Sequence, residues 1–302
     1  MKKILVTGSN GLLGQKLTDY ILSLDNLQLI TTSKGKNRVF TGGNYTYEEM
    51  DICNAEQVAE VLRKHRPDTL IHTAAITNVD TCHDDRKLCE EVNVKATANL
   101  IALCEELAIH FIYISTDFVF DGKAGPYKET DLPNPVSYYG ESKLRGELLT
   151  QQMKGKWAVI RTILVYGILK DMSRSNIVLW AKNALQSNTV IKVVNDQWRM
   201  PTLAEDLAWA SVAVAEKEAE GIFHISGPDM MSIADIVYKV ADFWNLDKSL
   251  IQEVSSAELN QEAKRPQKTG FILDKAMTKL NYRPHSFENG LEIVRQQLDQ
   301  QY

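Results

Sequence analysis

The N-terminal sequence KKILVTGSNGLLG places a short apolar run directly before three glycines. The run covers residues 4–6, and Gly8, Gly11 and Gly14 follow at a GxxGxxG spacing. Glycines permit a tight turn and let backbone N–H groups approach a pyrophosphate at the N-terminus of the next helix. The same glycines also suit a simple helix-capping turn. Their position between a first strand and a first helix favours a dinucleotide site.

Apolar runs rich in β-formers alternate with helical patterns through the first half of the chain. The runs predict strands at 4–6, 27–31, 69–73, 110–114 and 158–161, and the longer patterns predict helices at 11–24, 55–64, 86–107 and 138–153. Near-continuous apolar strands are typical of a parallel sheet covered on both faces. The alternation therefore predicts an α/β protein with a Rossmann-type, doubly wound parallel sheet.

The second half is less regular and shows no single break in composition. Helices are expected at 175–185, 203–219, 232–244, 274–280 and 287–298, and strands at 189–194 and 221–225. We expect residues 1–167 and about 203–227 to form the dinucleotide-binding domain. The ranges of about 168–202 and 228–302 would form a smaller, discontinuous substrate-binding domain, with the active site in the cleft between the two.

Composition excludes several classes of function. The 302 residues are 44% hydrophobic and carry a net charge of -5, so the basic excess of a nucleic-acid binder is missing. No apolar stretch approaches the ~18 residues that span a membrane, and the first apolar run is too short for a signal peptide. We expect a cytoplasmic protein without a metal. Its cysteines lack CxxC spacing and are expected to be reduced thiols: Cys53, Cys82, Cys89 and Cys104.

The segment after the second predicted strand bears on the choice between NAD and NADP. An acid there would bind the ribose 2′-OH of NAD, but residues 31–38 contain none. Ser33, Lys34, Lys36 and Arg38 suit a 2′-phosphate, so NADP is favoured, although a solvated basic loop is the alternative. The full set of expected cofactor contacts also includes Gly8, Asn10, Gly11, Leu12, Leu13, Gly14, Asp51, Ile52, Ala74 and Ala75.

Asp51, Ala74 and Ala75 are expected to contact the cofactor for different reasons. Asp51 either meets the adenine amino group or caps the helix that begins near residue 55. Ala74 and Ala75 end the third strand, where small side chains leave room for a cofactor. His72, just before them, is interpreted as a core histidine.

The sequence SYYGESK contains two tyrosines and a lysine. On a helix, residues four apart share a face, so Tyr139 pairs with Lys143 and Tyr138 does not. A nearby ammonium is expected to lower the phenol's pKa from about 10 toward neutrality. The phenol can then protonate a carbonyl oxygen as hydride arrives, with the hydroxyl of Thr116 bonded to the same oxygen. A surface helix pair is the alternative.

Several segments together resemble the extended short-chain dehydrogenase/reductases, and within them the dTDP-4-dehydrorhamnose reductase-like family. They are the glycine turn, STDFVFDG at 115–122, YGESKLRGE at 139–147, and RT, VYG, DQ, PT and DLA at 161, 165, 196, 201 and 206. The resemblance implies catalytic roles for Thr116, Tyr139 and Lys143, the last also holding the nicotinamide ribose. It implies a structural or proton-relay role for Asn93, which we count among the cofactor-binding residues. It also implies a nucleotide-sugar substrate, with a homodimer as one assembly such an enzyme can form.

Four residues are expected on the substrate side. Asp117 contacts substrate or caps a turn, and Gln197 faces the sugar or belongs to a loop turn. Trp198 is the loop aromatic best placed to touch substrate rather than the core. Arg265 binds a diphosphate or belongs to a solvated charge run.

The leading hypothesis is an NADPH-dependent reductase of a 4-keto nucleotide sugar. An epimerase or 4,6-dehydratase that retains NAD is a second possibility, but dehydratases of this superfamily carry a second acid after Thr-Asp, where this chain has Phe118. A third is a non-catalytic, NADP-binding subunit similar to the β-subunit of methionine adenosyltransferase, toward which the sequence Arg199-Met200-Pro201-Thr202 leans.

Overall fold

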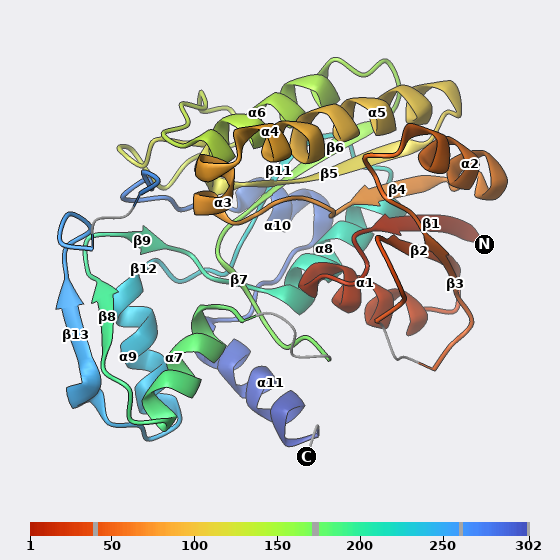
Figure 1. Ribbon diagram of the computed structural model, residues 1–302. Helices are drawn as coiled ribbons and strands as arrows, with labels where there is room; N and C mark the ends of the chain where they lie inside the picture. The colour runs from red at the N-terminus through yellow and green to blue at the C-terminus, as the bar shows by residue number, and fades with distance from the viewer. Residues whose placement is uncertain (39–41, 171–174, 260–261, 301–302) are drawn as a thin grey trace.

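The computed structural model describes residues 1–38, 42–170, 175–259 and 262–300. Over these residues the largest sheet has seven parallel strands in the order β11-β6-β5-β4-β1-β2-β3 (Figure 1). Their bounds are β1 (Lys2–Thr7), β2 (Leu27–Ser33), β3 (Thr46–Glu49), β4 (Thr69–His72), β5 (His110–Thr116), β6 (Trp157–Thr162) and β11 (Gly221–Ile225). The reversal of strand order beside β1 is the switch point where α/β sheets bind ligands. The expected doubly wound sheet is confirmed.

Helices cover both faces of this sheet, as Figure 1 shows. One face carries α2 (Ala55–His65), α5 (Ala96–Glu106) and α6 (Tyr138–Gln151), and the other carries α1 (Leu12–Leu22), α8 (Ala204–Glu216) and α10 (Asp274–Leu280). Each face has its own buried apolar cluster, with Leu5, Leu70 and Phe111 on the first and Ile4, Val6 and Ile112 on the second. This alternation along each strand explains why the strands read as continuous apolar runs.

A smaller lobe stands beyond the carboxyl ends of the strands. It contains α7 (Ile177–Gln186), α9 (Ile233–Phe243) and α11 (Phe287–Asp299), with β8 (Ile191–Val194) parallel to β13 (Ile251–Val254). Two short strand pairs complete the structure. Strand β7 (Val165–Tyr166) pairs with β10 (Thr202–Leu203), and β9 (Trp198–Arg199) pairs with β12 (Met231–Ser232). A separate core that includes Val178, Ile236 and Val237 holds this lobe together.

Three of the differences between the structure and the sequence-based expectations concern the larger lobe. Strand β3 lies at residues 46–49, where no strand was expected. The helix expected at 86–107 is α4 (Arg86–Cys89), a π-helical turn over Glu90–Lys95 and then α5. Finally, α10 packs into the core of the large sheet through Ala276 and Leu280, so this part of the range 228–302 lies with the cofactor lobe.

The cysteine prediction is wrong for two of the four residues. Cys82, on α3 (Val79–Asp84), forms a disulfide with Cys89 on α4, with 5.3 Å between the Cα atoms. The sharp junction between these two short helices brings together side chains seven residues apart, which spacing alone did not suggest. Cys53 and Cys104 are free thiols.

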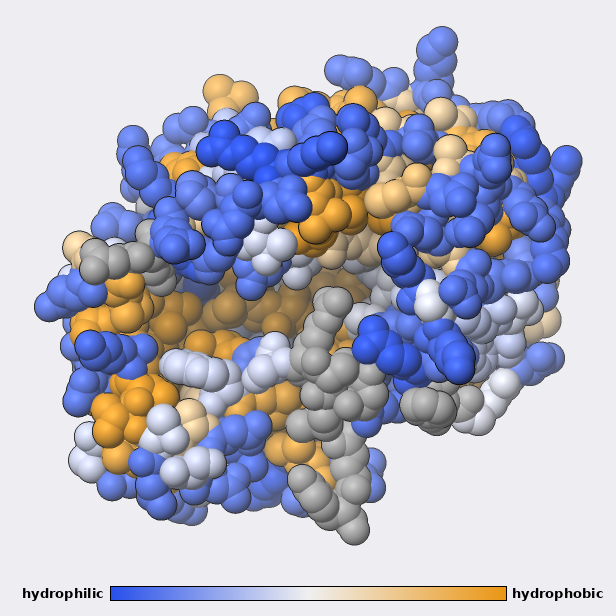
Figure 2. Space-filling model, in the orientation of Figure 1, coloured by the Kyte–Doolittle hydropathy of each residue, from blue (hydrophilic) through white to orange (hydrophobic). Residues whose placement is uncertain are grey.

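The two lobes leave a hollow between them, whose floor is largely apolar in the view of Figure 2. Within the described part of the chain, no helix is both long and apolar enough to cross a membrane. The same residues contain no group of three or more His, Cys, Asp or Glu side chains placed to hold a metal ion.

Candidate active site

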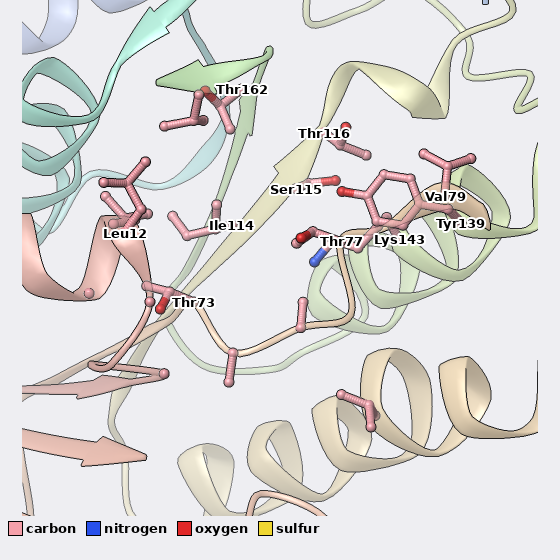
Figure 3. A pocket seen from close by; sticks show the side chains of 18 of the residues that line it. Leu12, Thr73, Thr77, Val79, Ile114, Ser115, Thr116, Tyr139, Lys143 and Thr162 are labelled. Carbon is pink, nitrogen blue, oxygen red and sulfur yellow. The ribbon is translucent and has the colours of Figure 1, made fainter. Parts of the chain in front are cut away.

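The hollow contains a cavity of about 1000 Å³. Its walls come from the glycine turn before α1, the ends of β2, β4, β5 and β6, the first turns of α6, and the smaller lobe. Figure 3 shows Tyr139 and Lys143 projecting from α6 toward Ser115 and Thr116 at the end of β5, with Leu12 and Thr162 on the opposite wall. One cavity therefore joins the predicted cofactor turn to the predicted catalytic residues.

The glycine turn has the backbone geometry that an anion site requires. Gly8 has φ 70°, and a Cβ there would lie 2.8 Å from the Ala74 nitrogen. A Cβ on Gly14 would overlap the Gly8 carbonyl oxygen. The N-cap Gly11 provides no side-chain cap and the first turn of α1 holds no acid, while Gly11, Leu12 and Leu13 line the cavity, so the start of α1 meets the cavity without a capping side chain. This cradle fits the pyrophosphate of a dinucleotide.

The loop after β2 is tied to the glycine turn by one side chain. Asn10 donates from Nδ2 to the Lys36 carbonyl at 3.0 Å and accepts at Oδ1 from the Arg38 backbone N–H at 2.8 Å. Lys34 lies 2.8 Å from Asp51, and its hydrogen bond lowers the carboxyl's pKa. Ser33, Lys34, Arg38 and Asp51 all line the cavity. A cation and an acid thus meet in the part of the cavity wall next to the glycine turn.

Tyr139 reaches the cavity because helix α6 approaches β5 closely. Ser137 caps α6 by accepting from the Gly140 N–H, and a Cβ on Gly140 would overlap the carbonyl oxygen of Phe118. Glycine at 140 therefore lets the helix touch the turn that follows Thr116. The Tyr139 ring packs edge-on against Phe118 with 5.6 Å between centroids, and its phenol hydrogen-bonds Thr116.

The expectation that Tyr139 has a lowered pKa is wrong for this state of the protein. Burial raises the pKa of the Tyr139 phenol, and the hydrogen bond with Thr116 offsets this only in part. Tyr139 is 7% exposed, so little water stabilises a phenolate. The phenol is protonated at neutral pH, which is the form that a proton donor needs.

Lys143 is also buried, with 4% exposure. Its Nζ lies 4.1 Å from the centroid of the Tyr113 ring, a cation–π contact. Burial lowers the pKa of Lys143 to about 7, and the charge of Glu147 acts against this shift. The side chain therefore changes charge near neutrality in the absence of any further partner.

We expect Lys143→Met to stabilise the unliganded protein below about pH 7 and to weaken both NADPH binding and turnover. The folded lysine loses its proton near pH 7 and the unfolded one near 10.5. Between these values the unfolded chain binds more protons, so the wild type gains stability as pH rises, by up to about 1.4 kcal/mol per pH unit. The variant lacks this gain. Urea unfolding of both proteins across this range measures the difference, and a pH-independent difference would contradict the assignment.

The remaining predicted residues divide into those that line the cavity and those that do not. Asp117, Gln197 and Arg265 line it, as do all the predicted glycine-turn and strand-end residues. Arg265 is paired with Asp80 at 2.7 Å, so it links the C-terminal part of the chain to α3. Trp198 is not among the lining residues and is 37% exposed, because its strand turns Arg199 inward instead.

Asn93 and Tyr138 also lie outside the cavity lining. Asn93 accepts from the Ile76 N–H at 2.9 Å and donates to the Ile76 carbonyl at 3.0 Å. It therefore fixes the loop after β4 from behind, a structural role. Tyr138 donates to Glu90 and stacks under Arg86, which identifies it as a packing residue.

A buried charge network lies behind the site and was not predicted from the sequence. Glu147, one turn beyond Lys143, accepts from Arg161 on β6 at 2.7 Å and from the Ser115 hydroxyl, and Arg161 also contacts His224 at 3.3 Å. Glu147 and Arg161 are 0% and 1% exposed. Glu147 lies four residues after Lys143, so helical spacing could have placed both side chains on the same face of α6. Nothing in the sequence paired Glu147 with Arg161.

His72 is a core histidine, as expected. Its Nδ1 lies 2.8 Å from the Thr7 hydroxyl and its Nε2 3.3 Å from the Thr97 hydroxyl. Burial, followed by the charge of Lys143, lowers the pKa of His72 to about 3, so the ring is neutral.

The strand order, the glycine turn and the Tyr–Lys pair one helical turn apart make this chain an extended short-chain dehydrogenase/reductase. Within that class, the chain belongs to the family described as the RmlD substrate binding domain, whose model matches residues 1–300.

Three known proteins illustrate the range of the similarity. The chain is 29% identical to a probable low-salt glycan biosynthesis reductase of Haloferax volcanii, over 87% of each chain. It is 27% identical to methionine adenosyltransferase 2 subunit beta of Bos taurus, over 85% of this chain and 76% of the relative. The solved dTDP-4-dehydrorhamnose reductase of Bacillus anthracis in complex with NADP is 26% identical, with a TM-score of 0.83, over 98% of this chain and 100% of the other.

Proposed function

We propose that the protein reduces the 4-keto group of a nucleotide-activated deoxysugar with NADPH. The observation that carries this proposal is that the buried Tyr139 and Thr116 line the same cavity as the glycine turn. The similarity to a dTDP-4-dehydrorhamnose reductase solved with NADP supports the same reaction class.

The chain's own residues supply binding and proton transfer. A nicotinamide cofactor, when bound, supplies the hydride. The N–H groups at the start of α1 would hold its pyrophosphate, and Lys143 would bind its ribose hydroxyls, which favour the ammonium form of the lysine. Tyr139 donates its phenolic proton to the carbonyl oxygen, and Lys143 stabilises the phenolate that remains.

Turnover with a panel of 4-keto nucleotide sugars tests the proposal. We expect NADPH consumption with at least one of them, matched by an equal amount of 4-hydroxy product. NADPH binding without consumption for every sugar in the panel would contradict it.

We expect Lys34→Ala to raise the KM for NADPH about 10-fold and to leave the KM for NADH within about twofold. Lys34 lines the cavity at the end of β2, and a charge-assisted hydrogen bond to a 2′-phosphate is worth roughly 1.5–3 kcal/mol. Lys36→Ala is the matched control, since Lys36 is exposed like Lys34 but lies outside the cavity lining. Equal effects on both cofactors would contradict the assignment of Lys34 to a 2′-phosphate.

A second candidate is a regulatory subunit without turnover. The similarity to methionine adenosyltransferase 2 subunit beta favours it, together with the buried Arg199 in the Arg-Met-Pro-Thr segment. Tight binding to a methionine adenosyltransferase catalytic subunit, with no sugar reduction, would select this candidate.

A further inference from the structure

The disulfide between Cys82 and Cys89 lies directly behind the active-site cavity. Both cysteines are fully buried and form one apolar cluster with the ring of Tyr139. Val79 on α3 and Leu88 on α4 line the cavity, and Val79 packs against the same cluster, as Figure 3 shows beside the ring of Tyr139. The disulfide therefore joins two parts of the cavity wall next to the proposed proton donor.

The chain between the two cysteines forms only a thin cover over the disulfide. Residues 83–88 are all exposed, and they belong to α3 and α4, helices of six and four residues. Short, exposed elements open locally at a low cost in free energy. Local opening therefore gives a dithiol in solution access to the sulfur atoms without unfolding of the protein.

The surroundings of the sulfur atoms suit the thiol form as well as the disulfide. Cys89 Sγ lies 3.3 Å from the Ser142 hydroxyl oxygen, and Cys82 Sγ lies 3.9 Å from the Ile76 carbonyl oxygen. The Ser142 hydroxyl donates its own proton to the Tyr139 carbonyl at 2.8 Å. Ser142 and Ile76 therefore each offer an acceptor to a thiol proton, which a disulfide sulfur lacks. Reduction leaves neither buried thiol without a partner.

Asn93 connects the disulfide to the loop after β4 and to α6. Its Nδ2 lies 3.3 Å from Cys89 Sγ, and the same atom donates to Ile76 at 3.0 Å and to Ser142 at 3.1 Å. A disulfide sulfur only accepts hydrogen bonds, whereas a thiol also donates one. Reduction therefore rearranges the hydrogen bonds that hold the loop after β4 and the helix that carries Tyr139.

We propose that Cys82 and Cys89 form a reversible dithiol/disulfide pair, whose closed form holds the α3–α4 wall of the cavity in place behind Tyr139. A thiolate of a dithiol attacks one sulfur and breaks the S–S bond, and the second thiol of the reagent then displaces the other cysteine. The dithiol is oxidised to its own disulfide, and its two electrons and two protons pass to the cysteines. This regulation rests on the proposed reductase function, since a less fixed wall beside the proton donor lowers turnover.

The first experiment concerns the redox state alone. The folded protein is equilibrated with mixtures of reduced and oxidised dithiothreitol, quenched with acid, and alkylated for mapping by mass spectrometry. We expect Cys82 and Cys89 to convert together and reversibly in a two-electron transition, while Cys53 and Cys104 remain thiols. Reduction only after addition of urea, or thiols at positions 82 and 89 in every mixture, would overturn the inference.

Hydrogen exchange measures the effect on the cavity wall. In the reduced wild type, the amides of residues 79–89 should exchange at least about 10-fold faster than in the oxidised form, with those of β5 unchanged. The double variant Cys82→Ser with Cys89→Ser should resemble the reduced form in both buffers. Cys53→Ser is the matched control and should respond to reduction as the wild type does, since Cys53 is a free thiol. Equal exchange in the two forms of the wild type would overturn the inference.

The third experiment uses turnover of a 4-keto nucleotide sugar. We expect kcat to fall about 3- to 30-fold in the reduced wild type and in the double serine variant, and only the wild type to recover after addition of oxidised dithiothreitol. An unchanged kcat in fully reduced protein would overturn the inference. If the wild type reduces no sugar in either state, the proposed function fails, while mass mapping and hydrogen exchange still decide whether the disulfide is a reversible restraint on the wall.

Discussion

Tyr139→Phe should lower kcat for a 4-keto nucleotide sugar by roughly 10²- to 10⁴-fold, the usual contribution of a general acid. The change removes the phenolic proton and its bond to Thr116, but keeps the ring that packs against Phe118. Because the glycine turn and Lys143 are untouched, the Kd for NADPH should stay within about twofold. Steady-state kinetics and a fluorescence titration of NADPH measure the two effects.

Tyr138→Phe is the matched control on the adjacent residue. Its hydroxyl bonds Glu90 outside the cavity, so its loss should change kcat by less than about twofold. A larger loss in Tyr138→Phe than in Tyr139→Phe would show that the wrong face of α6 has been assigned to catalysis.

Glu147→Gln should lower the free energy of unfolding by about 3–5 kcal/mol. The change leaves the guanidinium of Arg161 charged and buried without a counter-ion, and it replaces one of the two oxygens that accept from Arg161 by an NH2 donor. Chemical denaturation at neutral pH measures this loss. The double variant Glu147→Gln with Arg161→Met should recover much of it, since the uncompensated charge is then absent.

Glu106→Gln is a surface control for the same chemistry. Glu106 pairs with Arg63 at 3.1 Å, but both side chains are more than half exposed. Exposed pairs contribute about 0–1 kcal/mol, so this variant should be close to the wild type in stability. Similar losses in Glu106→Gln and Glu147→Gln would show that burial does not determine the effect.

The fold was largely predictable because its signals are local. Apolar runs and helical periods identified six of the seven sheet strands, since each buried strand is apolar on both faces. Strand β3 was missed because it lies at the sheet edge, with no buried side chain and the polar sequence TYEE. The π-helical turn around Asn93 was missed because its register depends on contacts with Ile76 and Ser142.

The site was predictable where spacing or strand ends decide position. Helical spacing chose Tyr139 over Tyr138, and the end of β5 identified Thr116. Contacts between distant segments were beyond that reasoning. Arg199 meets Asp117 only because β9 faces the end of β5, and alternation along β9 turns Arg199 inward and Trp198 outward. The raised pKa of Tyr139 likewise follows from burial by surrounding segments.

Transfer of deuterium from NADPH that carries deuterium at both C4 positions of the nicotinamide tests the central claim most directly. The purified wild type and Tyr139→Phe are each incubated with labelled NADPH and a 4-keto nucleotide sugar, and the product is analysed by mass spectrometry and NMR. We predict one deuterium at C4 of the sugar per NADPH oxidised by the wild type, and a rate lower by at least about 10²-fold in the variant. Equal rates in both proteins, or no label in any sugar tested, would contradict the account.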